Sequence, residues 1–257
     1  MPKEAFLYSE TKPVFDLIEE ASHRSGVSRG QAFEDFLHMS LCALSGGQME
    51  EQYLTTVQKH TTGNVGKRGC DSIGRAFGAL VSAMETTRKD ILGDLFQGGI
   101  TYGEAGQFLT PESVCDMMAR MSVDGVEVSE GERKTAFDPC CGSGRMLLAV
   151  GNIQPHWELV GQDIDLRCVR MTAINLALRN RYGHVIWGNS LGNEQRLIYR
   201  IGFNLRGFVR EIPIGECPLP VQEAASAASC TSNVPATDAP TVSGTNRPPG
   251  TLQLRLF

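Results

Sequence analysis

The first hundred residues carry apolar side chains three or four positions apart, a spacing that predicts amphipathic helices. Ser28 is suited to cap the second of these helices, and Gly46 with Gly47 would end it. Stripes at this spacing usually form a core, so residues 1–104 are predicted to be a helical N-terminal region. The stripes are Val14, Phe15, Leu17, Ile18 and Ala21, then Phe33, Phe36, Leu37 and Leu41, and between residues 73 and 96 Phe77, Leu80, Val81, Met84, Ile91 and Leu95.

A further helix start lies near residue 110. Thr110, Pro111 and Glu112 combine a capping residue, a first-turn proline and an acid. This combination predicts a helix capped by Thr110. The apolar positions expected to form its buried face are Val114, Met117, Met118 and Met121.

Beyond this helix, strand and helix patterns alternate. Strands are predicted at 134–138, 158–163 and 184–188, and helices are predicted from about residue 145 and over 166–180. Such alternation is typical of a parallel α/β sheet with right-handed crossovers. Residues 105–216 are therefore predicted to form an α/β domain.

The composition shifts after residue 216 to alanine, serine, threonine, proline and glycine. A segment of this kind buries too little apolar surface to offset the entropy of ordering it. Residues 217–250 are therefore predicted to be a disordered linker, followed by a short apolar peptide, TLQLRLF, at 251–257.

Composition narrows the class of protein. The chain has 257 residues and is 41% hydrophobic, without an apolar run near the ~18 residues that span a bilayer. The segment MPKEAFLYSETK lacks the apolar stretch of a signal peptide, so a soluble, cytoplasmic protein without membrane contact is expected. The eight cysteines include no CxxC pair and the five histidines have no ligand spacing, which predicts reduced thiols and no metal site.

Charge is unevenly distributed along the chain. The net charge of −5 argues against a protein that coats nucleic acid non-specifically. Residues 166–210, however, contain eight arginines and a single acid, Glu194. These arginines either form solvated helix faces or a surface that faces phosphates, because the guanidinium fork suits phosphate oxygens.

The stretch FDPCCGSGR, residues 137–145, follows the first predicted strand. Ligands of parallel sheets bind at the carboxyl ends of strands, and the glycines allow close backbone approach. Asp163 ends the second strand, where a carboxylate can accept from ribose hydroxyls, and Asn189 ends the third, where an amide could read adenine. The loop does not fit GxGxxG, and Asp138 suits a cationic amino-acid group, so S-adenosylmethionine is the expected ligand. An ordinary glycine turn is the alternative for the loop alone.

Four motifs occur in a fixed order: GQFLTP at 106–111, DPCCGSG at 138–144, GQDID at 161–165 and GNSL at 188–191. This set resembles the adenine-N6 DNA methyltransferases, particularly the modification subunit of type I restriction systems, over residues 90–192. The resemblance implies a truncated Rossmann-like methyltransferase core that uses S-adenosylmethionine and acts on DNA, with a separate specificity subunit as partner.

The resemblance also assigns roles to residues. Thr110 and its neighbours Gln107 and Phe108 would close over the methionine portion of the cofactor. Asp138 and the loop formed by Cys140, Gly142, Ser143 and Gly144 would hold the amino-acid moiety, and both Cys140 and Cys141 would be packed under that loop. Asp163 would bind the ribose, Ile164 the adenine face and Asn189 the adenine amine.

One motif of that family is missing. Its catalytic loop, an Asn- or Asp-Pro-Pro-aromatic sequence, directs the target amine at the methyl group and stacks on a flipped base. It occurs neither after Leu191 nor before Asp138, and Pro248-Pro249 lacks both amide and ring. Asn204 is a candidate substitute amide. The chain is thus either a DNA adenine methyltransferase whose catalytic groups are supplied unconventionally or by a partner, or a catalytically inactive S-adenosylmethionine- and DNA-binding protein.

Two further stretches suggest partners. Tyr199, Phe203 and Phe208 lie among arginines, which is compatible with clamping nucleic acid or with an edge strand that has a polar face. The terminal QLRLF resembles the peptide that bacterial proteins insert into the replication sliding clamp. Its candidate contact residues are Gln253, Leu254, Leu256 and Phe257, and a terminal strand on the protein's own sheet is the alternative.

Overall fold

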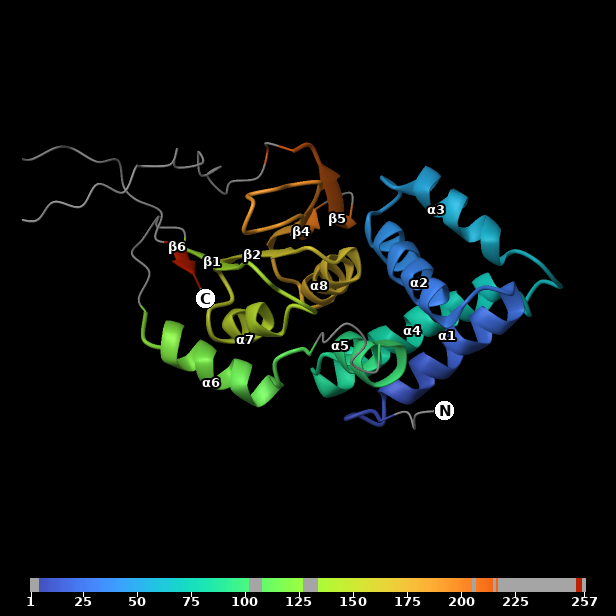
Figure 1. Ribbon diagram of the computed structural model, residues 1–257, viewed down its shortest axis with the longest axis horizontal. Coiled ribbons are helices and arrows are strands. Elements are labelled where there is room, and N and C mark those ends of the chain that lie inside the picture. The colour runs from blue at the N-terminus through green and yellow to red at the C-terminus, as the bar shows by residue number, and fades with distance from the viewer. Residues whose placement is uncertain are drawn as a thin grey trace, which may run out of the picture.

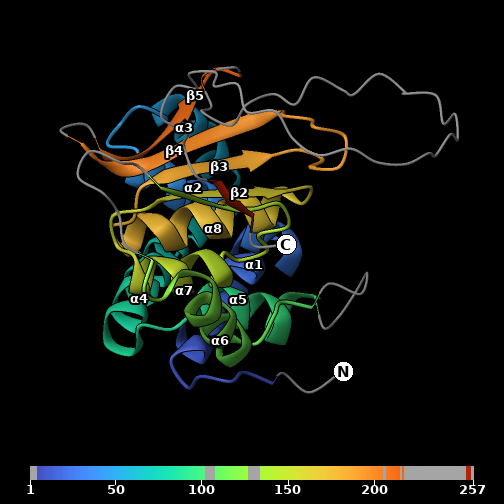
Figure 2. The same ribbon diagram turned by 90° about the vertical axis from the view of Figure 1, so that its left-hand side faces the viewer.

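The computed structural model describes residues 5–101, 108–126, 134–204, 207–214, 216 and 253–255. A mixed sheet lies against helices α7 and α8, and the N-terminal helices pack beyond them (Figures 1 and 2). The predicted α/β class, with a helical N-terminal region, is therefore confirmed. The predicted linker at 217–250 lies outside the described residues.

The N-terminal region is helical as predicted, with more breaks than the pattern indicated. Its elements are α1 (Thr11–Ser25), α2 (Arg29–Leu44), α3 (Glu50–Val57), η1 (Gln58–His60), α4 (Gly69–Thr87), α5 (Ile91–Leu95) and the π-helical turn η2 (Phe96–Thr101). Ser28 caps α2, because its side chain accepts from the amide of Gln31 at 3.1 Å. The stripe over 73–96 is divided at Arg88, which has φ 55°, and Asp90 caps the new helix α5.

Six strands form the sheet in the order β5-β4-β3-β2-β1-β6. They are β1 (Thr135–Asp138), β2 (Glu158–Asp163), β3 (Gly183–Trp187), β4 (Leu197–Asn204), β5 (Gly207–Ile212) and β6 (Gln253–Arg255). Strands β1, β2 and β3 are parallel, as predicted, and α7 (Arg145–Ile153) and α8 (Leu166–Leu178) connect them. Strands β4 and β5 continue the sheet as an antiparallel hairpin beside β3.

Helix α6 (Glu112–Val123) corrects two predictions. The helix has Pro111 at its N-cap position and no capping bond from a side chain, so Thr110 is not the cap. Its buried residues are Cys115, Ala119 and Val123, whereas Met117 is 54% and Met121 is 80% exposed. The reason is close packing of α6 on α7, which small side chains permit and long methionines would prevent.

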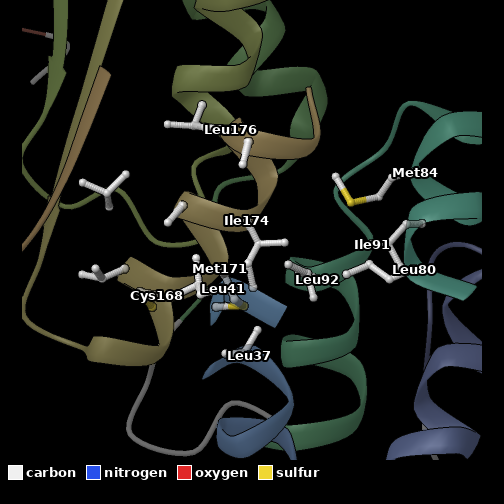
Figure 3. Close-up of a cluster of buried hydrophobic side chains, with 14 of the residues drawn as sticks. Leu37, Leu41, Leu80, Met84, Ile91, Leu92, Cys168, Met171, Ile174 and Leu176 are labelled. Atoms are coloured by element: carbon white, nitrogen blue, oxygen red, sulfur yellow. The ribbon is translucent and has the colours of Figure 1, made fainter. Parts of the chain in front are cut away.

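The helices of the N-terminal region share one core with the α/β part. Leu37 and Leu41 of α2, Ile91 and Leu92 of α5, and Met171 of α8 converge in a single apolar cluster (Figure 3). All five are at most 2% exposed. The two regions therefore pack as one body, although the sequence pattern separates them near residue 104.

The C-terminal peptide contributes strand β6. Gln253, Leu254 and Arg255 pair in parallel with Thr135, Ala136 and Phe137 of β1. This pairing matches the alternative of a terminal strand on the protein's own sheet. Leu256 and Phe257, the other two candidate clamp residues, lie outside the described residues. In the part of the chain that the structure describes, no helix is long and apolar enough to cross a membrane.

Candidate functional site

The site is built at the point where β1 ends and α7 begins. Gly142 and Gly144 have φ values of 55° and 86°, a region that side chains disfavour. A Cβ on Gly142 would come within 2.6 Å of Leu109, and one on Gly144 within 3.0 Å of Thr172. Glycine is thus required at both positions by conformation and by space, so that the turn can pack between the 108–110 segment and α8.

Two carboxylates flank this turn, Asp138 buried and Asp163 partly buried. The Oδ1 atom of Asp138 accepts from the amide of Cys140 at 3.1 Å, and Asp163 accepts from the amides of Gly142 and Asp165, each at 2.9 Å. Burial raises the pKa of Asp138 to about 6, and the charge of Asp163 adds to this effect. Burial also raises the pKa of Asp163. Neither carboxylate forms an ion pair with another described side chain.

A cavity opens between the turn and the segment that precedes α6. Its volume is about 170 Å³, and it is open to solvent on one side. Its wall contains Phe96, Phe108, Leu109, Thr110, Cys115, Asp138, Cys140, Cys141, Gly142, Ser143, Arg145, Met146, Asp163 and Cys168. The cavity therefore combines an apolar wall, a glycine turn and two carboxylates.

Most of the residues singled out from sequence meet at this cavity. Phe108, Thr110, Asp138, Cys140, Gly142, Ser143 and Asp163 line it. Gly144, Ile164 and Asn189 do not line it. Ile164 is 62% exposed, and the Asn189 side chain accepts from the amide of Leu191 at 3.1 Å. Gln107 lies outside the described residues.

The two adjacent cysteines have different environments. Cys141 is buried, and a Cβ on Gly161 of β2 would approach its Sγ to 3.0 Å. Cys140 is exposed, so the expectation that both are packed beneath the turn is wrong for Cys140. Among the described residues, no cluster of three histidine, cysteine or acidic side chains could hold a metal ion.

A buried ionic network that the sequence did not reveal supports the turn. Asp90, which precedes α5, accepts from Arg145 Nε at 2.7 Å, Ser143 Oγ at 2.5 Å and Asn175 Nδ2 at 2.8 Å. Arg145 also donates to the carbonyl of Thr110 at 3.2 Å. The N-terminal helices thereby hold both walls of the cavity. Asp90 was recognisable as a helix cap, but contacts over 53 or more positions have no local signal.

The direction of β4 determines where Asn204 lies relative to the cofactor cavity. The cavity lies at the carboxyl ends of β1 and β2, while β4 is antiparallel to β3. Asn204 ends β4 and lines a different cleft, near Gly183 at the start of β3. Asn204, considered from sequence as a candidate substitute amide, therefore lies at the opposite end of the sheet from the cofactor cavity.

The residues present suit S-adenosylmethionine. A carboxylate that is buried without a cationic partner is costly, and a ligand ammonium group would remove this cost. Asp138 offers that feature, and Asp163 stands one strand away at the position suited to ribose hydroxyls. The glycine turn leaves room for the ligand between them.

Comparison with known proteins agrees with this chemistry. Residues 87–201 match the family model of N-6 DNA methylases. Curated relatives include ribosomal protein uL3 glutamine methyltransferases of Xylella fastidiosa, 30% identical over 93 residues, and of Xanthomonas campestris, 30% identical over 89 residues. These matches cover 35% and 34% of this chain and 27% and 28% of the relatives, so the chain spans only about a quarter of their length.

Two solved structures are also similar, although their overall structural similarity to this chain is low. One is a class I S-adenosylmethionine-dependent methyltransferase of Listeria monocytogenes, with TM-score 0.36, 12% identity and coverage of 67% of this chain and 51% of that one. The other is a type I restriction-modification methyltransferase subunit of Streptococcus thermophilus, with TM-score 0.34, 12% identity and coverage of 66% and 55%. Over residues 87–201, a little under half of its length, this chain is thus similar to the N-6 DNA methylases, and the chemistry of the cavity is compatible with S-adenosylmethionine.

Proposed function

We propose that the cavity between β1, β2 and the 108–110 segment binds S-adenosylmethionine, and that the chain acts on the N6 amine of adenine in DNA. The observation that carries this proposal is the pair of carboxylates beside the glycine turn, the buried Asp138 and the partly buried Asp163. A restriction-modification setting, with a specificity subunit that selects the DNA sequence, follows from the same family resemblance.

Each wall of the cavity has a role in this proposal. Asp138 would accept from the ammonium group of the amino-acid moiety and Asp163 from the ribose hydroxyls, while Phe108 and Thr110 would exclude water from the opposite side. Ile164 and Asn189 keep their predicted roles at the adenine ring as part of the proposal. When bound, S-adenosylmethionine supplies an electrophilic methyl group, and the chain's contribution is to hold and orient its two ends.

A second candidate is an S-adenosylmethionine- and DNA-binding protein that does not transfer the methyl group. The antiparallel course of β4 favours it, because this strand carries its terminal Asn204 away from the cofactor cavity. Under the first candidate a partner protein supplies the catalytic loop. Under the second no partner restores transfer.

Calorimetric titration tests the cofactor site. Wild-type protein should bind S-adenosylmethionine at pH 8 and lose affinity below about pH 6, where the Asp138 carboxylate becomes protonated. Asp138→Asn should bind at least about tenfold more weakly, since removing a charge-assisted hydrogen bond costs about 1.5–3 kcal/mol. Asp116→Asn, on the exposed face of α6, is the matched control and should bind like the wild type. Equal affinity for all three proteins would contradict the assignment.

A transfer assay with tritiated methyl donor separates the candidate functions. The substrates are adenine-containing duplex DNA, the same duplex with N6-methyladenine at every adenine, and a glutamine-containing peptide. Label in the first duplex only supports adenine-N6 transfer, and label in the peptide would replace DNA by a protein substrate. Cofactor binding without label in any substrate, alone or with cell extract, would support the second candidate.

A further inference from the structure

A second cleft lies at the other end of the sheet. It is lined by Glu158 and His184 near the starts of β2 and β3, by Arg200 and Phe203 of β4, and by Arg210 of β5. The cofactor cavity lies where β1 and β2 end, so the two openings are separated by the length of β2, roughly 17 Å for the five steps of ~3.3 Å between its six residues. The cleft has a volume of about 610 Å³, against about 170 Å³ for the cofactor cavity, so it is the larger of the two.

Three basic side chains stand in one row across this cleft. His184, Arg200 and Arg210 are register partners on β3, β4 and β5, so they project from the same face of the sheet. Like charges that face each other across strands destabilise a sheet. An anion bound between Arg200 and Arg210 would remove this repulsion.

Acidic neighbours do not neutralise the two arginines of this row. Glu158 is paired with His184 at 3.0 Å. Glu211 is adjacent to Arg210 in sequence but lies on the opposite face, where it is the register partner of Tyr199 and accepts from Gln52 at 3.3 Å. Among the ion pairs between described residues, none includes Arg200 or Arg210. The guanidinium groups of Arg200 and Arg210 can therefore bind phosphate oxygens.

An aromatic ring stands beside the basic row. Phe203 is 69% exposed, and its ring lies 5.2 Å from that of Phe208 at an angle of 52°. The pairing of β4 with β5 is irregular between Ile201 and Asn204. Gly202 has φ 141°, and a Cβ at this position would lie only 3.2 Å from the Cβ of Tyr182. This irregularity leaves Phe203 largely exposed to solvent beside Phe208, so that part of its ring surface is available to a ligand.

We propose that this cleft binds single-stranded nucleic acid, with phosphates at Arg200 and Arg210 and a base stacked on Phe203. Phosphate recognition explains the unpaired arginines, and stacking explains the exposed ring. A duplex hides the faces of its bases, so a single strand fits the combination better. The site is distinct from the cofactor cavity and does not depend on methyl transfer.

Fluorescence anisotropy of the full chain with labelled twenty-nucleotide thymidine and uridine strands tests the proposal. Phe203→Leu keeps apolar bulk without an aromatic face and should weaken binding about 5- to 150-fold, whereas Phe203→Tyr should restore it. Arg200→Gln and Arg210→Gln should each flatten the slope of log affinity against log salt by about 0.7. Arg75→Gln, at an exposed arginine of α4, is the control and should leave affinity and slope unchanged.

Several results would overturn the proposal. They are no binding of either strand, equal binding by Phe203→Leu and wild type, or tighter binding of duplex than of single strand. Preference between the two labelled strands assigns the ligand to DNA or RNA. Titration of S-adenosylmethionine into the same variants should give wild-type affinity, so failure of the cofactor site and failure of this cleft are observed separately.

Discussion

Asp138 lowers the stability of the fold when its carboxylate is ionised. Its pKa of about 6 lies above the ordinary value of 3.8, so the folded protein binds this proton more tightly than the unfolded chain does. Stability from this group is therefore greatest at low pH and falls as the pH rises from about 4 to about 6. Above that range the ionised carboxylate remains buried without a cation.

Asp138→Asn should stabilise the protein without ligand. The gain at pH 8 should be at most on the order of 3 kcal/mol, because the shift from 3.8 to about 6 corresponds to that energy. The gain should be clearly smaller at pH 5, where the wild-type carboxyl is largely protonated. Urea unfolding at the two pH values measures it, with Asp116→Asn as control. A gain that is independent of pH would contradict this account.

Asp90 is a positioning residue, because it acts on the cavity through Ser143 and Arg145. Asp90→Ala leaves the Arg145 guanidinium buried without its counter-charge, which should destabilise the fold by about 3–5 kcal/mol. Asp90→Leu combined with Arg145→Met removes both charges and should recover much of that loss. Urea unfolding checks the stabilities.

Cofactor affinity separates positioning from general stability. The Asp90→Leu/Arg145→Met protein should fold yet bind S-adenosylmethionine more weakly, because Thr110 loses its hydrogen bond from Arg145 and Ser143 loses its acceptor. If this double variant bound the cofactor like the wild type, the network would have no role in positioning the turn.

At the level of elements, short sequence patterns correctly predicted the features that depend on residues close together in sequence, such as strand bounds and helix caps. The bounds of β2 were predicted as found, because a short apolar run between the polar residues Glu158 and Asp163 defines it. Ser28 was predicted as a cap because its bond to Gln31 spans three residues. The buried face of α6 was predicted wrongly, because the prediction gave weight to the hydrophobicity of the methionines and none to side-chain size. In the structure α7 packs closely on α6, and the small residues Cys115 and Ala119 lie in the contact.

The corrected face of α6 can be tested by substitution. Met121→Glu should change stability by no more than about 0.5 kcal/mol, since Met121 is 80% exposed. Ala119→Leu should destabilise by about 1–3 kcal/mol, because Ala119 is fully buried against α7 and a larger side chain overpacks the contact. Thermal and urea unfolding give both values. The reverse order would restore the methionine face as the buried one.

Strand β6 bears on the predicted partner of the C-terminal peptide. Gln253 and Leu254 cannot pair with β1 and lie in a clamp groove at the same time. Clamp binding stays a prediction, and it would require these residues to leave the sheet.

Across the whole molecule, sites and regions are connected in ways that the sequence could not indicate. The order of the motifs predicted a methyl-donor site, because each motif is a short local pattern. The second cleft depends on the register of Arg200 with Arg210 and on the reversal of β4, which follow from strand pairing. Net charge gave no sign of it, since −5 is an average over the chain, whereas the arginines of residues 166–210 and the aromatic residues among them did suggest a nucleic-acid surface as one alternative.

The Asp90 network also constrains how this sequence can change over evolutionary time. Positions 90, 143, 145 and 175 come from the N-terminal helices, the glycine turn, α7 and α8, yet their polar atoms meet at one carboxylate. A change at position 90 alone leaves the buried guanidinium of Arg145 without its counter-charge, so viable descendants should alter positions 90 and 145 together. The helical region and the methyl-donor fold are consequently inherited as one unit, and recombination between relatives near residue 104 should yield proteins that fold poorly.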